Sequence, residues 1–134
     1  YFVEHHWNEL LKFSRRSEYS MNRWAARYGY EHTPKAIMDK AKKGGNGRYA
    51  AVNLCNYHTV EFRLFRGTLK YNTFIATIQL VNHICDAAKY NTDESIAKLS
   101  WSNFVADITE PELIQYLKER QLYVNEEVRA EEEM

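Results

Sequence analysis

Residues 48–67 read RYAAVNLCNYHTVEFRLFRG, and this stretch decides the fold. It contains two runs that favour β-strands, separated by a short turn at residues 56–58. Because successive strand residues point to opposite faces, the stretch predicts a hairpin that holds Asn53, Glu61 and Arg63 on one face. An amide, a carboxylate and a guanidinium held together on rigid strands suit metal–phosphate chemistry.

A three-residue turn sets the register of this hairpin. On one face it pairs only apolar residues, which we expect to lie on the core: Leu54 with Val60, Val52 with Phe62 and Ala50 with Leu64. On the other face it makes three pairs: Asn53 with Glu61, Ala51 with Arg63 and Tyr49 with Phe65. A slip of one residue would bury Glu61 or Arg63, so the register is well specified.

The composition is that of an ordinary globular chain. Its 134 residues suffice for one domain with a core, and 18 Lys and Arg residues balance 18 Asp and Glu residues. This balance argues against a nucleic-acid or membrane-surface binder, because such domains are usually strongly basic. The two cysteines, Cys55 and Cys85, make no disulfide framework, so we expect two buried thiols and a cytoplasmic location. No apolar run reaches the length of a membrane span.

Helical spacing of apolar residues covers most of the chain outside the hairpin. The patterns predict helices over residues 2–15, 17–28, 34–43, 73–89, 93–99, 100–107 and 109–123. Ser17 and Thr33 are expected N-caps, and Thr109 begins a capping box with Glu112. We therefore expect an α+β fold, with helices packed on an antiparallel hairpin in a single domain over residues 1–124. Residues 125–134 are acidic and are expected to be a disordered tail.

The longest expected helix, over residues 73–89, carries a wide apolar stripe. We expect its buried side to consist of Phe74, Ile78, Val81, Cys85 and Ala88, widened by Ile75, Leu80 and Ile84. A stripe of this width is typical of a helix packed deep against a sheet.

Three segments together resemble a known family. They are GRYAAVN at residues 47–53, TVEFRLFRGTL at 59–69 and TFIATIQLV at 73–81. The combination of two paired strands and a following helix resembles the amidoligase family, one of the glutamine synthetase-like carboxylate–amine ligases. The likeness extends more loosely from residues 22–25 to Trp101 and covers roughly the C-terminal half of the family's domain.

The resemblance implies an ATP-dependent ligase that activates a carboxylate as an acyl phosphate, which an amine then attacks. The substrates would be small-molecule or peptide carboxylates and amines, and magnesium ions would bridge carboxylates and phosphate oxygens. Carried over by position, Glu61 would be a magnesium ligand and Arg63 would neutralise the transferring phosphoryl group. Asn53 would bind metal or substrate, and Arg48 and Arg66 would reach the nucleotide phosphates.

The chain departs from the family in one respect. The family's N-terminal half supplies a Glu-x-Glu strand and a His-bearing strand, and neither is recognisable here. Because the chain also starts at Tyr1 within a helical pattern, we expect it to be part of a longer protein and inactive as an isolated ligase. A hairpin taken from a larger sheet leaves strand edges to pair, so we also expect a dimer or larger assembly.

Other interpretations remain open at this stage. Glu61 and Arg63 can be a solvated cross-strand pair, which contributes only about 0.2–1 kcal/mol and needs no function. Tyr49 and Phe65 can stack on an adenine ring or simply cover neighbouring strands. The whole chain can be a non-catalytic protein interaction module. A nucleic-acid binder that uses the basic residues 40–48 is disfavoured by the zero net charge.

Overall fold

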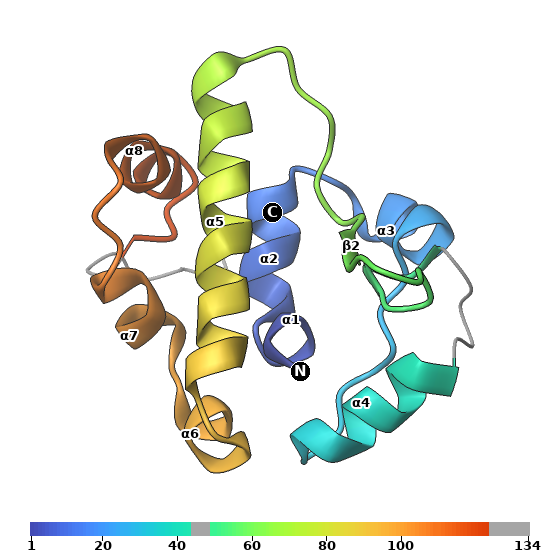
Figure 1. Ribbon diagram of the computed structural model, residues 1–134. Helices are drawn as coiled ribbons and strands as arrows, with labels where there is room; N and C mark the ends of the chain where they lie inside the picture. Colours follow the sequence, from blue (N-terminus) through green and yellow to red (C-terminus); the bar gives the residue numbers. More distant parts are fainter. Residues whose placement is uncertain (44–48, 124–134) are drawn as a thin grey trace. The chain divides into compact units, whose positions relative to one another are not determined.

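The computed structural model describes residues 1–43 and 49–123. Within them the chain forms eight α-helices and a two-stranded antiparallel hairpin (Figure 1). This confirms the α+β class, while the likeness to a glutamine synthetase-like domain stays a prediction. The chain divides into two compact units, Tyr1–Arg66 with Asn91–Lys98 and Gly67–Tyr90 with Leu99–Met134. The single domain expected over residues 1–124 stays a prediction, and the tail at 125–134 lies outside the described residues.

The first unit begins with two short helices instead of the one expected. These are α1 (Phe2–His5) and α2 (Trp7–Ser14). His6 interrupts them with φ −110° and ψ 34°, away from helical values, and its buried ring packs on Phe2 with 4.6 Å between ring centroids. Arg15 then ends α2 in the left-handed region, at φ 62°.

The next two helices have the N-caps that the sequence predicts. They are α3 (Glu18–Trp24) and α4 (Pro34–Lys43). Ser17 Oγ accepts a hydrogen bond from the Ser20 backbone N at 3.1 Å, and Thr33 Oγ1 accepts one from the Ala36 backbone N at 3.2 Å. Each side chain satisfies a backbone donor that the first helical turn leaves open.

Helix α3 ends at Trp24, four residues earlier than expected, because the chain after it joins the hairpin. Ala26 donates its backbone N–H to the Tyr49 carbonyl at 2.7 Å, and Ala26 O accepts from the Ala51 backbone N at 2.8 Å. These bonds make an isolated parallel bridge between Ala26 and Ala50. Hydrogen bonding to the strand edge competes with continuation of the helix, and the helical pattern of the sequence does not reveal it.

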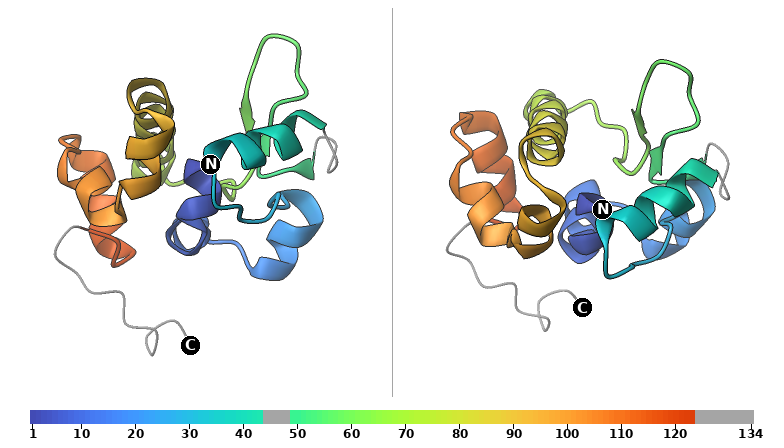
Figure 2. Two further views of the ribbon diagram at one scale, coloured as in Figure 1. Left: turned by 90° about the horizontal axis from the view of Figure 1, so that it is seen from below. Right: turned by 60° about the horizontal axis from the view of Figure 1, so that its bottom comes forward.

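The hairpin consists of β1 (Val52–Asn53) and β2 (Glu61–Phe62). Val52 pairs with Phe62 and Asn53 with Glu61, which confirms the expected register. The strands are shorter than expected, and the connection at residues 54–60 is longer than the three-residue turn. This loop extends away from α3 and α4 (Figure 2).

The expected core face of the hairpin is confirmed at Ala50 and Leu64, which are fully buried, and is wrong elsewhere. Asn53 and Ala51, both assigned to the outer face, are fully buried, whereas Val52 and Phe62 are only half-buried and Val60 is exposed. The bridge to Ala26 explains part of this difference, since it places a third segment beside β1. The polar face of β1 is therefore an interior surface, with consequences for the role of Asn53.

The second unit is built on α5 (Tyr71–Tyr90), which packs against α8 (Pro111–Glu119). The buried side of α5 is Thr73, Ala76, Leu80, Ile84 and Ala87. The expected stripe is thus wrong, because Phe74, Ile78, Cys85 and Ala88 are exposed and only the widening residues Leu80 and Ile84 lie inside. Small residues at 76 and 87 give the buried side little hydrophobicity for its area. The packing of this helix against the sheet stays a prediction.

The remaining helices are α6 (Asp93–Lys98), which packs against α4 in the first unit, and α7 (Trp101–Ala106) in the second. At the start of α8 the N-cap is Glu110, not Thr109. The expected capping box is absent because the Glu112 carboxylate accepts from Gln79 Nε2 at 3.1 Å on α5 instead. Both cysteines are free and exposed, contrary to expectation. No described helix combines the length and the apolar character needed to cross a membrane.

Candidate functional site

The hairpin brings Asn53, Glu61 and Arg63 together as the register predicts. Asn53 Nδ2 donates to Glu61 Oε1 at 3.3 Å across the two strands. Arg63 Nη1 lies 3.6 Å from the same Glu61 oxygen. Glu61 and Arg63 are both partly exposed, so one carboxylate and one guanidinium face solvent at the same spot.

Asn53 is the buried member of this group and positions Glu61. Its residue is 1% exposed, and its Oδ1 accepts from the Cys55 backbone N at 2.9 Å. Its Nδ2 also lies 3.4 Å from Asn56 Oδ1. The Asn53 amide is buried, and its hydrogen bonds go to the loop and to Glu61. Such a residue suits a positioning role better than direct contact with a ligand.

Arg63 lies among aromatic residues as well as beside Glu61. Its guanidinium carbon is 5.4 Å from the centroid of the Tyr49 ring, within the range of a cation–π contact. Its Nε donates to the Trp24 carbonyl at 3.4 Å, a long bond. Ala51 lies opposite Arg63, and its small side chain leaves room for the Arg63 side chain.

From Tyr49 the same pattern continues onto α3. The Tyr49 and Trp24 rings meet edge to face, with 5.8 Å between centroids. Arg23 lies 5.1 Å from the Trp24 ring centroid, and its Nη1 donates to the Tyr19 hydroxyl at 3.2 Å. We call Tyr19, Arg23, Trp24, Tyr49 and Arg63 the arginine–aromatic row.

Sequence reasoning missed the α3 half of this row. Trp24, the last residue of α3, is 45% exposed. The spacing of Tyr19 and Arg23, four residues apart on one helix, was a usable signal for a side-chain pair. Nothing in the sequence relates Trp24 to Tyr49, because their contact depends on the backbone bridge at Ala26.

More arginines lie at the end of α2. The Arg66 backbone N donates to the Ser14 carbonyl at 3.2 Å, and Arg15 Nη2 donates to the Arg66 carbonyl at 3.0 Å. Burial, and then the positive charge of Arg63, lower the pKa of the Arg16 guanidinium, although an arginine remains charged at neutral pH. The buried Arg15 Nε has no hydrogen-bond partner.

Two expected nucleotide-binding residues have different outcomes. Arg66 contributes its backbone to the contact with α2, and its exposed side chain leaves the phosphate role a prediction. Arg48 lies outside the described residues.

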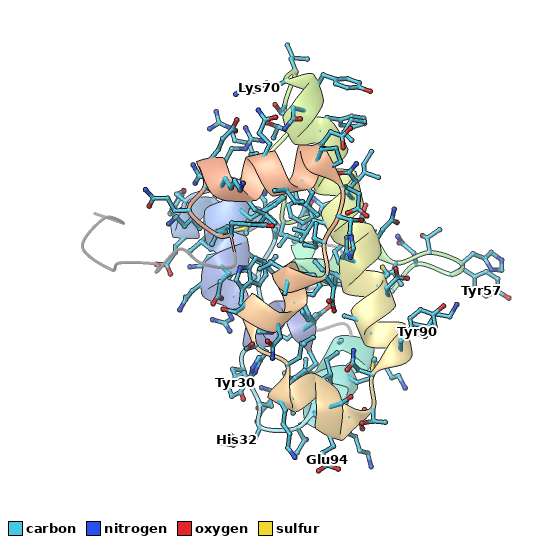
Figure 3. The ribbon with its side chains drawn as sticks, turned by 90° about the vertical axis from the view of Figure 1, so that its left-hand side faces the viewer. Tyr30, His32, Tyr57, Lys70, Tyr90 and Glu94 are labelled. Atoms are coloured by element: carbon cyan, nitrogen blue, oxygen red, sulfur yellow. The ribbon has the colours of Figure 1, made fainter. Side chains whose placement is uncertain are left out.

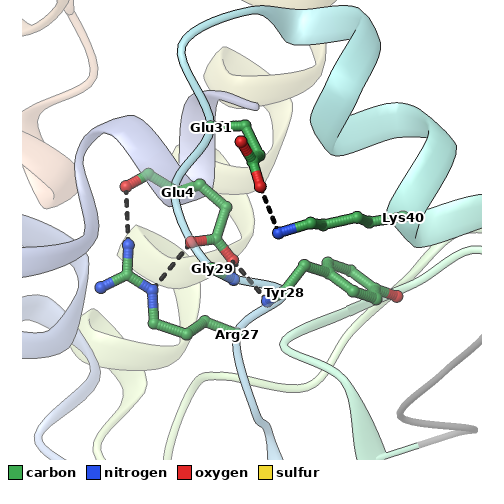
Figure 4. A network of polar contacts seen from close by, with 6 residues as sticks. All are labelled: Glu4, Arg27, Tyr28, Gly29, Glu31 and Lys40. Carbon is green, nitrogen blue, oxygen red and sulfur yellow. Dashed lines mark hydrogen bonds and ion pairs between the residues drawn. The ribbon is translucent and has the colours of Figure 1, made fainter.

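A second polar cluster supports the site without belonging to it (Figure 4). The buried Glu4 carboxylate accepts from Arg27 Nε at 2.8 Å and from the Tyr28 and Gly29 backbone N atoms at 2.6 and 3.2 Å. Tyr28 in turn donates its hydroxyl to the Val52 carbonyl at 2.9 Å, and burial raises the pKa of its phenol. Glu4 thus ties α1 to β1, a role that no sequence pattern indicated.

The described residues do not make a magnesium site by themselves. They contain no group of three His, Cys, Asp or Glu side chains placed to hold a metal ion. Glu61 supplies one carboxylate, and Arg63 places a positive charge beside it. A guanidinium beside a single acid suits an anion better than a cation.

Comparisons with known proteins add no relative. No protein-family model, no curated protein and no solved structure matches the chain.

Proposed function

We propose that this chain is the C-terminal part of an ATP-dependent carboxylate–amine ligase of the amidoligase type. The observation that carries the proposal is the juxtaposition of Asn53, Glu61 and Arg63 on two antiparallel strands, with 3.3 and 3.6 Å separations. The sequence segments that resemble the family are the same segments that form this arrangement. ATP and magnesium are the cofactors that the proposal includes.

In this proposal Arg63 neutralises charge on the transferring phosphoryl group, a role suited to its planar fork of donors. Glu61 would help to hold a magnesium ion, together with acidic residues that the described chain does not supply, and the ion would neutralise phosphate charge. Asn53 positions Glu61 through its side-chain hydrogen bond. A complete ligase needs further acidic residues, so the isolated chain is expected to bind nucleotide without forming an amide.

The test is ATP binding by the full chain, followed through backbone amide NMR shifts with magnesium present. We expect saturable shifts at residues 61–66 and no ATP turnover. Arg63→Gln is expected to weaken binding about tenfold, since a charge-assisted hydrogen bond is worth about 1.5–3 kcal/mol. Lys35→Gln is the matched control, because Lys35 is an exposed cation on α4 and its loss changes net charge equally.

Three results would contradict the proposal. An absence of shifts at residues 61–66 would remove the nucleotide from this site. Equal weakening by Arg63→Gln and Lys35→Gln would reduce the effect of Arg63 to net charge. Robust ATP turnover by the isolated chain would instead show that the chain is not an incomplete ligase.

One observation favours a second function, a non-catalytic interaction module. Tyr71, Phe74 and Ile78 are exposed on α5, and Leu69 is exposed just before it. Exposed apolar residues at helical spacing are typical of surfaces that bind another protein. In that case variants of Phe74 and Ile78, and not of Arg63, would abolish function.

A further inference from the structure

The arginine–aromatic row alternates planar apolar rings with guanidinium groups. Each neighbouring pair is in contact, from Tyr19 through Arg23 to Trp24, and from Trp24 through Tyr49 to Arg63. All five residues belong to the first unit, and they come from α3 and from both sides of the hairpin. The row is therefore assembled by the fold and is not a single helix face.

The aromatic members of the row are exposed. Trp24 is 45% exposed and Tyr49 is 40% exposed, while Tyr19 protrudes further still. Trp24 and Tyr49 are thus two exposed rings in direct contact with each other, and arginines flank them on both sides. Exposed rings interleaved with arginines are the surface on which nucleic-acid bases stack, because every base has a π-face and carries phosphate nearby.

The charge around the row is unbalanced. The Arg63 guanidinium lies beside the Glu61 carboxylate, while the Arg23 guanidinium contacts the Trp24 ring and the Tyr19 hydroxyl. An anion beside Arg63 would accept charge-assisted hydrogen bonds from its guanidinium, as phosphate does when bound by arginine.

We propose that the arginine–aromatic row binds a nucleoside polyphosphate, with the base against the Trp24 indole and the phosphates against Arg63. This inference deepens the proposed ligase function and depends on it for the identity of the nucleotide as ATP. A mononucleotide fits better than a strand, because two adjoining rings and two arginines offer one base position in a chain of zero net charge.

Isothermal titration with four probes tests the assignment: ATP, inorganic tripolyphosphate, adenosine and an oligothymidine. We expect ATP to bind more tightly than tripolyphosphate or adenosine, since only ATP uses both parts of the row. Trp24→Leu is expected to weaken ATP binding about tenfold and to leave tripolyphosphate binding unchanged, because a stacked base contributes about that factor. Arg63→Gln is expected to weaken the binding of both.

Tyr90→Leu is the matched control. Tyr90 is also exposed and carries a cation, Lys89, 5.2 Å from its ring centroid, but it belongs to the second unit. The Tyr90→Leu variant should therefore bind ATP as tightly as the unmodified chain. Thermal melting followed by circular dichroism checks that each variant is folded, and Trp24→Phe, which keeps a ring, should restore most of the affinity if Trp24→Leu proves unstable.

Three results would overturn the assignment. Equal binding of ATP and tripolyphosphate would reduce the row to an anion site. Tighter binding of the oligothymidine than of ATP would make it a single-strand site. Loss of ATP binding in Tyr90→Leu equal to that in Trp24→Leu would show a non-specific effect.

The two proposals can fail separately. If ATP shifts the amides of residues 61–66 but Trp24→Leu has no effect, the row assignment falls and the ligase proposal stands. If Trp24→Leu weakens ATP binding while Glu61→Gln changes neither the affinity nor its magnesium dependence, the row stands and the ligase proposal falls.

Discussion

At the scale of single residues, the polar interior decides more than the sequence pattern reveals. Glu4 and Asn53 are both buried, and each accepts backbone N–H groups from a non-helical segment. Their hydrogen bonds take the place that regular strand pairing fills in a larger sheet. Glu4 reads in the sequence as an ordinary helical acid, because its partners at Tyr28 and Gly29 lie more than twenty residues away.

We expect Glu4→Gln to destabilise the protein by about 1.5–3 kcal/mol. The new amide would place N–H groups against the donors of Tyr28 and Gly29 and remove the charge that pairs with Arg27. Urea unfolding followed by circular dichroism measures the change. Glu94→Gln is the control, since that exposed acid forms a surface pair with Lys98 and its loss should cost less than about 0.5 kcal/mol. Equal costs for the two variants would show that Glu4 is not a structural anchor.

At the scale of elements, alternation predicted the pairing of the hairpin but not its environment. Asn53 opposite Glu61 follows from residue parity and a consistent register, and the structure confirms it. Which face is buried depends on what packs there, and next to the bridge at Ala26 the expected outer residues Ala51 and Asn53 are buried as well. The candidate site divides in the same way: its hairpin residues could be predicted, while Trp24 joins through a tertiary contact with Tyr49.

Helix α5 shows why a hydrophobic pattern alone can choose the wrong face. If the apolar residues are judged by side-chain size, the side with Phe74 and Ile78 is expected to be buried. The side that packs in the structure contains Ala76 and Leu80 instead. Small residues allow a neighbouring helix to approach closely, and such an interface gains from packing density more than from the size of each side chain. The sequence contains too little information to separate these two sides before α8 is placed.

We therefore expect Leu80→Ala and Ile78→Ala to differ sharply in their effects on stability. Leu80 is 0% exposed, so its truncation leaves a cavity and should cost about 2–5 kcal/mol. Ile78 is 47% exposed, and its truncation should cost less than about 1 kcal/mol. Guanidinium unfolding of both variants gives the comparison. A larger loss for Ile78→Ala would restore the face that the sequence favours.

At the scale of the whole molecule, we expect the chain to associate with itself. Exposed apolar residues on α5 and a two-stranded hairpin with an edge at β2 are both surfaces that pair with copies of the same chain. Light scattering should give a mass of a dimer or more. Ile78→Glu should lower that mass if the helix face is used, and Val60→Lys should lower it if the strand edge is used. A monomer at high protein concentration would contradict the expectation.

The loop at residues 54–60 has a practical consequence. Tyr57 is 92% exposed and points outward at its tip, where the side chain is drawn in Figure 3. Hydrogen bonds of Asn53 and Asn56 hold the base of the loop, so its outer part contributes little to the stability of the fold. Such tips tolerate insertions well. The segment between Tyr57 and His58 is therefore a natural attachment point for a dye or an immobilising tag, a few residues from Glu61.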